Sequence, residues 1–315
     1  MVATDVITFP ERPHDPDLLN LDVQETHFFK SLTGIQDDEE LKQHIIKVQK
    51  KAYQVCQEPG KPYSSNKTFK TYPYPCIAIF AFTSLRSSRL PGYNQALELS
   101  RTRSDPIFLD LGCCFGNILR KAVVDGWPVE GAIGSDLHRG LWEYGHELFK
   151  SSPEMFPAGF VAGDALSSAL IEPKEPFYSP PQTPRPADLR ALASLTPLQG
   201  HVSAINASLF FHLFNEEQQL FLAKQVATLL STESGSVIFG VHSGQAEKGA
   251  NTEVMVTQGG HMFSHSPGSW KNLWECQVFK PGSVKVEAEL AHRPRPLSYG
   301  AGLISNWLVW SVTRL

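Results

Sequence analysis

Short apolar segments alternate with helical patterns between residues 106 and 243. Apolar runs that predict strands occur in "PIFLDLG" (106–112), "VEGAIGSD" (129–136), "PAGFVAGDAL" (157–166), the beginning of "GHVSAINASLFFHLF" (200–214) and "GSVIFGVHS" (235–243). Helical periodicity separates them in "NILRKAVVDG", "RGLWEYGHELFK" and "NEEQQLFLAKQVATLLS". Asn215 is the expected N-cap of the last helix, with Gln218 three positions on. Strands that alternate with helices predict a parallel sheet covered on both faces.

The two ends of the chain have different patterns. A helical segment, "SPGSWKNLWECQ" (266–277), precedes "GSVKVEAELA" and "LISNWLVWSVTRL", which predict an antiparallel pair of strands. Residues 1–35 show little periodicity and are interpreted as a loose lead-in, and residues 92–102 predict a short helix. Prolines argue against a helix in residues 71–82. Residues 37–57 predict an amphipathic helix whose apolar face carries Leu41, Ile45, Val48 and Ala52.

These patterns predict two parts of the chain. Residues 1–104 are expected to form an N-terminal arm and helical cap, and residues 105–315 a Rossmann-like domain. The segment 172–190 contains six prolines and is predicted to be a surface insertion of that domain.

Composition narrows the function classes. The chain has 315 residues, 42% of them hydrophobic, and a net charge of −4, so no general affinity for nucleic acid or anionic membrane is indicated. No apolar run reaches the ~18 residues that a membrane span needs, and the N-terminus lacks the pattern of a signal peptide. We therefore expect a cytoplasmic protein with a small-molecule substrate; the oligomeric state stays open. The five cysteines include no CxxC pair, so we expect no metal site, and Cys113 and Cys114 are interpreted as apolar packing.

The turn after the first predicted strand is a candidate ligand loop. In "DLGCCFGNILRK", Gly112 and Gly116 lie between the strand and a helix, where free backbone N–H groups and the helix dipole favour a carboxylate or phosphate. Glycine permits close approach of a ligand to the backbone. The spacing is not the dinucleotide pattern GxGxxG, and the absence of GKS or GKT argues against a nucleoside-triphosphate loop.

Three acids follow successive predicted strands. Asp110 precedes the loop, Asp136 ends the second strand 26 positions later, and Asp164 ends the third. In Rossmann-like sheets an acid at the second position accepts hydrogen bonds from ribose hydroxyls, and ligands bind at the carboxyl edge of the strands. The three acids together therefore indicate a nucleoside-containing ligand.

The ordered motifs "FLDLGCCFG", "GSDL", "AGDAL" and "NASLFFHLF" resemble those of class I S-adenosylmethionine-dependent methyltransferases. With "YPYPCI", "LWEYGHELF" and "SWKNLWE", the chain from about residue 71 onward is similar to a fungal group of methyltransferases that act in meroterpenoid and related secondary-metabolite pathways. The resemblance implies S-adenosyl-L-methionine as cofactor. It also implies an α/β fold with a Rossmann-like seven-stranded, mostly parallel sheet, an antiparallel C-terminal strand and an N-terminal helical cap.

The resemblance also implies roles for residues. Asp110, Gly112 and Gly116 would shape the loop around the methionine part of the cofactor. Asp136 would hold the ribose hydroxyls. The remaining implied cofactor contacts are Leu137, Asp164 and Ala165 at the adenine, Asn206 and Ala207 beneath the sulfonium, and Tyr72 and Tyr74 closing over the site.

Residues after the fourth predicted strand are candidates for contact with the acceptor. His212 in "FFHLF" is the candidate general base or orienting donor, with a packed or capping histidine as the alternative. His242, His261 and His265 are weaker candidates. The crowded aromatic residues predict either core or an apolar pocket wall, and the wall would consist of Phe210, Phe211, Trp270 and Trp274.

The sequence therefore predicts an O-methyltransferase of a small apolar terpenoid or polyketide. The resemblance slightly favours a carboxyl acceptor, which is ionised at neutral pH and needs no base. Transfer to nitrogen or carbon is one alternative. A NAD-dependent oxidoreductase and a catalytically silent cofactor-binding partner are the others.

Overall fold

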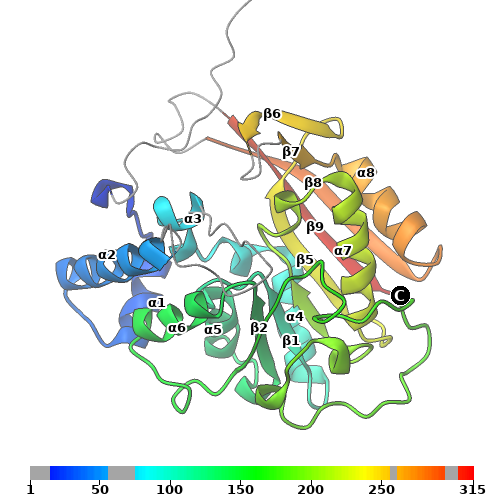
Figure 1. Ribbon diagram of the computed structural model, residues 1–315, viewed down its shortest axis with the longest axis horizontal. Helices are drawn as coiled ribbons and strands as arrows, with labels where there is room; N and C mark the ends of the chain where they lie inside the picture. Colours follow the sequence, from blue (N-terminus) through cyan, green and yellow to red (C-terminus); the bar gives the residue numbers. More distant parts are fainter. Residues whose placement is uncertain (1–14, 56–74, 256–260, 295–303) are drawn as a thin grey trace, which may run out of the picture.

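The computed structural model describes residues 15–55, 75–255, 261–294 and 304–315, and these contain a seven-stranded sheet in the order β3-β2-β1-β4-β5-β9-β8 (Figure 1). Neighbouring strands from β3 to β5 are parallel, whereas β9 is antiparallel to both β5 and β8. The predicted mostly parallel sheet with an antiparallel C-terminal strand is confirmed. The strands are β1 (Phe108–Leu111), β2 (Ala132–Asp136), β3 (Gly159–Ala162), β4 (Ala204–Asn206), β5 (Val237–Ser243), β8 (Val284–Pro294) and β9 (Ile304–Arg314).

Helices cover both faces of the sheet (Figure 1). α4 (Pro91–Thr102), α5 (Asn117–Val124) and α6 (Arg139–Leu148) pack on the face to which Phe108 points. α7 (Glu216–Leu229) and α8 (Pro267–Asn272) pack on the face to which Leu109 points. α8 continues as a π-helical segment, η8 (Leu273–Val278). The parallel strands are therefore buried on both sides, as their apolar sequences predict.

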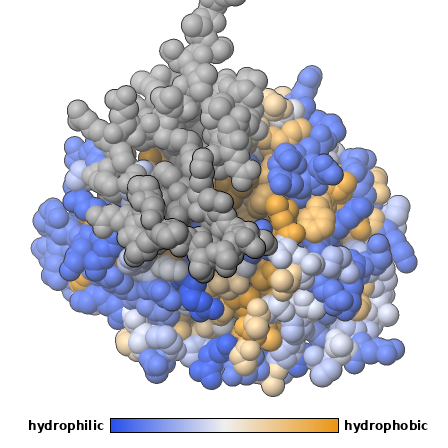
Figure 2. Space-filling view, in the orientation of Figure 1, coloured by the Kyte–Doolittle hydropathy of each residue, from blue (hydrophilic) through white to orange (hydrophobic). Residues whose placement is uncertain are grey.

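An N-terminal group of helices packs against α6. α2 (Asp38–Val55) buries the predicted apolar face, and its exposed side is mostly hydrophilic in Figure 2. The His44 ring nitrogen Nε2 lies 2.9 Å from the Leu148 carbonyl oxygen of α6. Aromatic rings of α1 (Val23–Thr33) stack on the same region, with the centroids of Phe29 and Phe149 5.3 Å apart. The division of the chain into two parts stays a prediction. In the structure, α2 shares one continuous core with α5 and α6.

Two N-terminal predictions were wrong. The lead-in interpretation of residues 1–35 fails because Val23–Thr33 is a helix, α1, with Asp22 and Glu25 forming a capping box. The prolines of residues 71–82 do not prevent a helix, because Pro75 is the first residue of the short helix α3 (Pro75–Ala78). Proline is tolerated there, since the first N–H of a helix has no partner inside the helix.

A two-stranded ribbon lies outside the main sheet and was not predicted. β6 (Gly249–Met255) pairs antiparallel with β7 (His261–Ser264), and the pairing shifts register between Asn251 and Met255. The ribbon follows β5 at the carboxyl edge of the sheet (Figure 1).

The proline-rich segment 172–190 lies between β3 and β4 in the chain. Tyr178 anchors it: the Tyr178 hydroxyl oxygen accepts a hydrogen bond from the Lys280 backbone N–H at 2.8 Å, and the Arg314 guanidinium donates to the Phe177 carbonyl at 2.7 Å. Among the described helices, none is long and apolar enough to cross a membrane.

Candidate functional site

The loop between β1 and α5 has a backbone that only a few residue types adopt without strain. Gly112, Cys114 and Gly116 have positive φ values of 72°, 51° and 75°. A Cβ atom on Gly112 would lie 2.9 Å from Cδ2 of Phe210, and one on Gly116 would lie 2.6 Å from Cζ3 of Trp142. Both glycines are therefore required by backbone conformation and by space.

Asp136, at the end of β2, holds this loop in place. Its Oδ2 accepts a hydrogen bond from the Cys114 N–H at 2.9 Å, and its Oδ1 accepts from the His138 N–H at 3.1 Å. Burial raises the pKa of the Asp136 carboxyl above its ordinary value, although these backbone hydrogen bonds oppose the shift. The acid predicted for ribose thus lies directly against the glycine loop.

Asp110 and Asn206 are side by side because β1 and β4 are neighbours in register. Asp110 pairs with Asn206 across the two parallel strands. The Asn206 Nδ2 donates to Asp110 Oδ1 at 2.7 Å, and the Ser208 hydroxyl donates to Asn206 Oδ1, also at 2.7 Å. The pKa of Asp110 is raised to about 7, mainly by burial and also by the charge of Asp136, whereas hydrogen bonds from the Asn206 side chain and the Leu119 backbone oppose the shift.

The third acid lies at the same edge in a more open position. Asp164 follows β3 by two residues and is exposed, and its Oδ1 accepts a hydrogen bond from the Leu166 N–H at 2.9 Å. Leu137 is 39% exposed and follows β2 directly, and Ala165 is half-buried beside Asp164. Ala207, by contrast, is fully buried directly after β4. The predicted cofactor residues therefore follow the order of strands β4, β1, β2 and β3 along one edge.

The loop cysteines are protonated thiols in a packed environment. Burial, together with nearby carboxylates, raises the pKa of Cys113 well above its ordinary value. A hydrogen bond with the Cys76 thiol, followed by burial, does the same for Cys114. The described residues contain no group of three or more His, Cys, Asp or Glu side chains suited to a metal ion.

The cap also contacts this loop, through residues that sequence reasoning missed. Asn117, the first residue of α5, donates its side-chain amide to the Phe82 carbonyl at 2.5 Å, and the rings of Phe82 and Phe115 are 4.5 Å apart. Cys76 of α3 reaches Cys114 of the loop. The predicted contacts of Tyr72 and Tyr74 lie outside the described residues, so they stay predictions.

His212 lies in η7 (Phe211–Leu213), between the end of β4 and α7. Its Nδ1 accepts a hydrogen bond from the Ser243 N–H at 3.2 Å, so the neutral ring carries its proton on Nε2. Burial lowers the pKa of His212 to about 4. The ring is therefore neutral at physiological pH and offers an N–H donor at Nε2 rather than a free lone pair.

The structure favours the core alternative for three of the four predicted wall residues. Phe211, Trp270 and Trp274 are each 0% exposed. Phe211 packs against Trp270 and Trp274 with ring centroids 5.1 and 6.0 Å away, on the face covered by α7 and α8. Their burial favours packing in the core, and a role of these three side chains in a pocket wall stays a prediction. Phe210 differs, because its ring lies over Gly112 at the loop.

The structure describes the surroundings of two of the three weaker histidine candidates. His242 belongs to the same buried aromatic group and accepts a hydrogen bond from Trp310 Nε1 at 3.0 Å. His265 is buried, and its Nδ1 lies 2.8 Å from the Ser269 hydroxyl oxygen. Burial lowers the pKa of both rings. The side chain of His261 is outside the described part of the chain.

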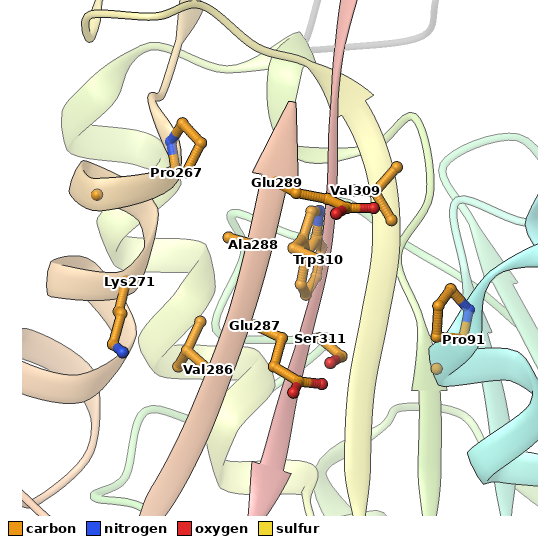
Figure 3. Close-up of a pocket in the computed structure, with 12 residues that line it drawn as sticks. Pro91, Pro267, Lys271, Val286, Glu287, Ala288, Glu289, Val309, Trp310 and Ser311 are labelled. Carbon is orange, nitrogen blue, oxygen red and sulfur yellow. The ribbon is translucent and has the colours of Figure 1, made fainter. Parts of the chain in front are cut away.

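Two surface hollows lie apart from the three acids. One of about 540 Å³ lies over β8 and β9, and Pro91, Pro267, Glu287 and Trp310 are among the residues around it (Figure 3). The other, of about 630 Å³, lies between α7 and α8 and includes Lys248 and His265. Neither is lined by Asp110, Asp136 or Asp164, so the candidate site is placed by the strand ends and the glycine loop.

The chain is similar to known proteins in sequence and in fold. A family described as "Meroterpenoid methyltransferase N-terminal domain" matches residues 14–60. The chain is 32% identical over 249 residues to the "Asnovolin E/Chermesin D methyltransferase nvfJ" of Aspergillus novofumigatus (strain IBT 16806), covering 79% of this chain and 80% of the relative. It is 31% identical over 218 residues to the "O-methyltransferase phiE" of Fungal sp. (strain ATCC 74256), covering 69% of this chain and 64% of the relative. A solved structure, "the plantazolicin methyltransferase BpumL in complex with SAH", aligns with a TM-score of 0.45 and 13% identity over 93% of this chain and 96% of that chain.

Proposed function

Because the chain belongs to the class I S-adenosylmethionine-dependent methyltransferases of fungal secondary metabolism, we propose that it methylates an oxygen atom of a small apolar natural product, with a carboxyl group as the preferred acceptor. The names of the relatives support this proposal: one is an asnovolin E/chermesin D methyltransferase, and another is an O-methyltransferase.

The residues at the carboxyl edge fit the cofactor. S-adenosylmethionine supplies an activated sulfonium methyl group, so the protein mainly has to bind and orient the two reactants. The loop with Gly112 and Gly116 would accommodate the methionine part, Asp136 the ribose hydroxyls and Asp164 the adenine amino group. The Asp164 and Leu137 side chains are both exposed at this edge, which supports this assignment.

The protonation state of the His212 ring supports a carboxyl group as the acceptor. A phenol or alcohol benefits from a general base, and a base must present a free lone pair. The Ser243 N–H occupies the Nδ1 lone pair of His212, and the proton therefore sits on Nε2. Such a ring donates a hydrogen bond, which suits an ionised carboxylate. A carboxylate needs no proton removal, so the protein would mainly have to hold its oxygen in line with the methyl group that the cofactor would supply.

Matched acceptors test the proposal. The enzyme would be incubated with S-adenosylmethionine bearing a labelled methyl group and with three versions of one apolar scaffold: the free acid, the primary alcohol and the phenol. We expect label in an ester of the acid, which mild base hydrolyses, and little in the other two products. Label that is stable to base and found only in the phenol or alcohol would overturn the carboxyl preference. Label bound to nitrogen or carbon would overturn O-methylation.

A further inference from the structure

Two thiols from distant parts of the chain meet beside the glycine loop. Cys76 lies in α3, and Cys114 lies in the loop between β1 and α5. The two thiols share a hydrogen bond, and both side chains pack, half-buried, against the same apolar cluster. Methyl transfer as proposed above uses neither thiol, so their contact calls for a separate explanation.

Neighbouring contacts hold the two thiols in place. On the N-terminal side, the Phe82 carbonyl accepts a hydrogen bond from the Asn117 side-chain amide at 2.5 Å, and the rings of Phe82 and Phe115 lie 4.5 Å apart. On the loop side, the Cys114 N–H donates to Asp136 Oδ2 at 2.9 Å. The fold therefore keeps the two sulfur atoms as neighbours, which is the first requirement for a bond between them.

The backbone of Cys114 indicates that its side chain has a role. Its φ of 51° lies in the region that favours glycine, between Gly112 and Gly116 with φ values of 72° and 75°. Residues other than glycine in this region concentrate at functional sites. Cys113 has a different environment, because a Cβ atom on Gly134 of β2 would lie 2.8 Å from its Sγ. Cys113 thus packs on the sheet, whereas Cys114 contacts α3.

We propose that Cys76 and Cys114 form a reversible disulfide that hinders binding of the cofactor at the glycine loop. The oxidant is a small-molecule disulfide such as oxidised glutathione. One protein thiolate attacks a sulfur atom of the oxidant, which gives a mixed disulfide and releases a glutathione thiolate that takes up the proton lost by the attacking thiol. The second protein thiol loses its proton, attacks the sulfur atom of the first cysteine and releases the second glutathione, which takes up that proton. Two protein thiols are oxidised, and the oxidant is reduced to two thiols.

The disulfide would act on the cofactor through the loop backbone. This inference rests on the proposed function, which places the methionine part of the cofactor at the loop and the ribose at Asp136. A disulfide holds its sulfur atoms about 2.05 Å apart, closer than a hydrogen bond does, so Cys114 would be drawn toward α3. That movement would disturb the hydrogen bond from the Cys114 N–H to Asp136 and would fix α3 against the loop. Both changes oppose cofactor binding.

The pair stays reduced until it meets an oxidant. The hydrogen bond with Cys76, followed by burial, raises the pKa of Cys114 well above its ordinary value. A protonated thiol is a poor nucleophile, so exchange should be slow at neutral pH. Oxidation is therefore best tested at pH 8.5, where more of each thiol is ionised.

The experiment treats the reduced full chain with oxidised glutathione at pH 8.5. Intact mass, peptide mapping without reduction and calorimetry with S-adenosylmethionine are then measured. In the wild type we expect a mass loss of two hydrogen atoms and a cross-linked peptide pair that contains Cys76 and Cys114. Cofactor binding should weaken by about tenfold or more, the loss expected when a hydrogen bond to a charged group is broken. Dithiothreitol should reverse the cross-link and restore the affinity.

Two variants separate the pair from other cysteines. Cys76→Ser removes one partner outside the glycine loop, so it should form no cross-link and keep its affinity after oxidation. Cys276→Ser removes an exposed cysteine elsewhere and should respond to oxidation as the wild type does. Equal responses of the two variants would overturn the proposal. If Cys76→Ser fails to fold, the wild type still decides through peptide mapping and reversal by dithiothreitol.

The two levels of the proposal fail in different ways. If the reduced wild type binds neither S-adenosylmethionine nor S-adenosylhomocysteine, the proposed function fails, and the proposed effect on the cofactor fails with it. If the reduced wild type binds, but oxidation gives no bond between Cys76 and Cys114 or leaves the affinity unchanged, the function stands and the redox role of the pair is wrong.

Discussion

Trp142 of α6 occupies the space that a side chain on Gly116 would need. A Cβ atom at Gly116 would lie 2.6 Å from Cζ3 of Trp142, which stacks on Phe160 of β3 with ring centroids 5.0 Å apart. The loop that begins α5 is thus shaped by a helix and a strand that follow it in the sequence. This contact between Trp142 and Gly116 explains why a turn with only two glycines adopts one conformation.

Gly116→Ala should impair cofactor binding and stability together. The substitution adds both a clash with Trp142 and strain at φ 75°, at a cost of about 1–3 kcal/mol. Gly140→Ala in α6 is the matched control, because a Cβ there meets nothing within 4 Å and Gly140 is not among the positive-φ glycines. Urea unfolding and calorimetry with S-adenosylmethionine measure both effects. Equal behaviour of the two variants would contradict the account of the loop.

Asp136→Ala should weaken cofactor binding by about 10- to 150-fold, since charge-assisted hydrogen bonds contribute about 1.5–3 kcal/mol each. The variant would lose the ribose contact, and it would also lose the hydrogen bond that the Cys114 N–H donates to the carboxylate. Glu130→Ala removes an exposed acid just before the opposite end of the same strand and should bind the cofactor as the wild type does. A similar loss in both variants would point to net charge rather than to the site.

Asp110→Asn should stabilise the protein at high pH while it reduces cofactor binding. The pKa of Asp110 is about 7 in the folded protein and about 4 in the unfolded chain, so ionisation costs stability as pH rises from 4 to 7. The variant should therefore exceed the wild type in free energy of unfolding by up to about 4 kcal/mol at pH 8 and by little at pH 4. Denaturant titrations at both pH values measure this difference. A gain that does not depend on pH would refute the buried-carboxylate explanation.

Trp274→Ala should lower stability and leave substrate recognition unchanged. The side chain is 0% exposed and packs against Phe211, Trp270 and Trp310, so its truncation should cost about 3–5 kcal/mol. Phe210→Leu, by contrast, alters the ring over Gly112 and is expected to change the KM for the cofactor. A changed acceptor KM in a folded Trp274→Ala protein would restore the pocket-wall interpretation.

His212→Ala should retain most of the turnover on a carboxyl acceptor. The ring is a donor, and its pKa of about 4 leaves it neutral above pH 5.5, so the wild-type kcat should show no inflection near pH 6.5 that the variant lacks. A loss of about a hundredfold or more, with an inflection that disappears in the variant, would instead identify His212 as a general base. His212→Gln, which keeps a donor, should fall between the wild type and the alanine variant.

The sheet could be predicted from the sequence because its signals are local. Each strand is a short apolar run, and each acid follows its own strand, so the order of Asp110, Asp136 and Asp164 along one edge needs only parallel pairing. The contact of Asp110 with Asn206 also needs β1 and β4 to be neighbours, which no local pattern specifies. The same holds for Cys76 and Cys114, which come from separate parts of the chain.

Other features were missed for identifiable reasons. The capping box of Asp22 and Glu25, with Phe28 and Phe29 in the next turn, was a usable signal for α1 that the polar lead-in obscured. The aromatic run around Phe211 was ambiguous, because core and pocket walls have the same composition. Burial, which depends on α7 and α8, favours the core alternative.

Calorimetric titration of the purified chain with S-adenosylmethionine and, separately, with NAD tests the central claim most directly. The account predicts saturable, one-to-one binding of S-adenosylmethionine that Asp136→Ala weakens and Glu130→Ala does not, with no binding of NAD. Saturable binding of NAD without binding of S-adenosylmethionine would contradict it.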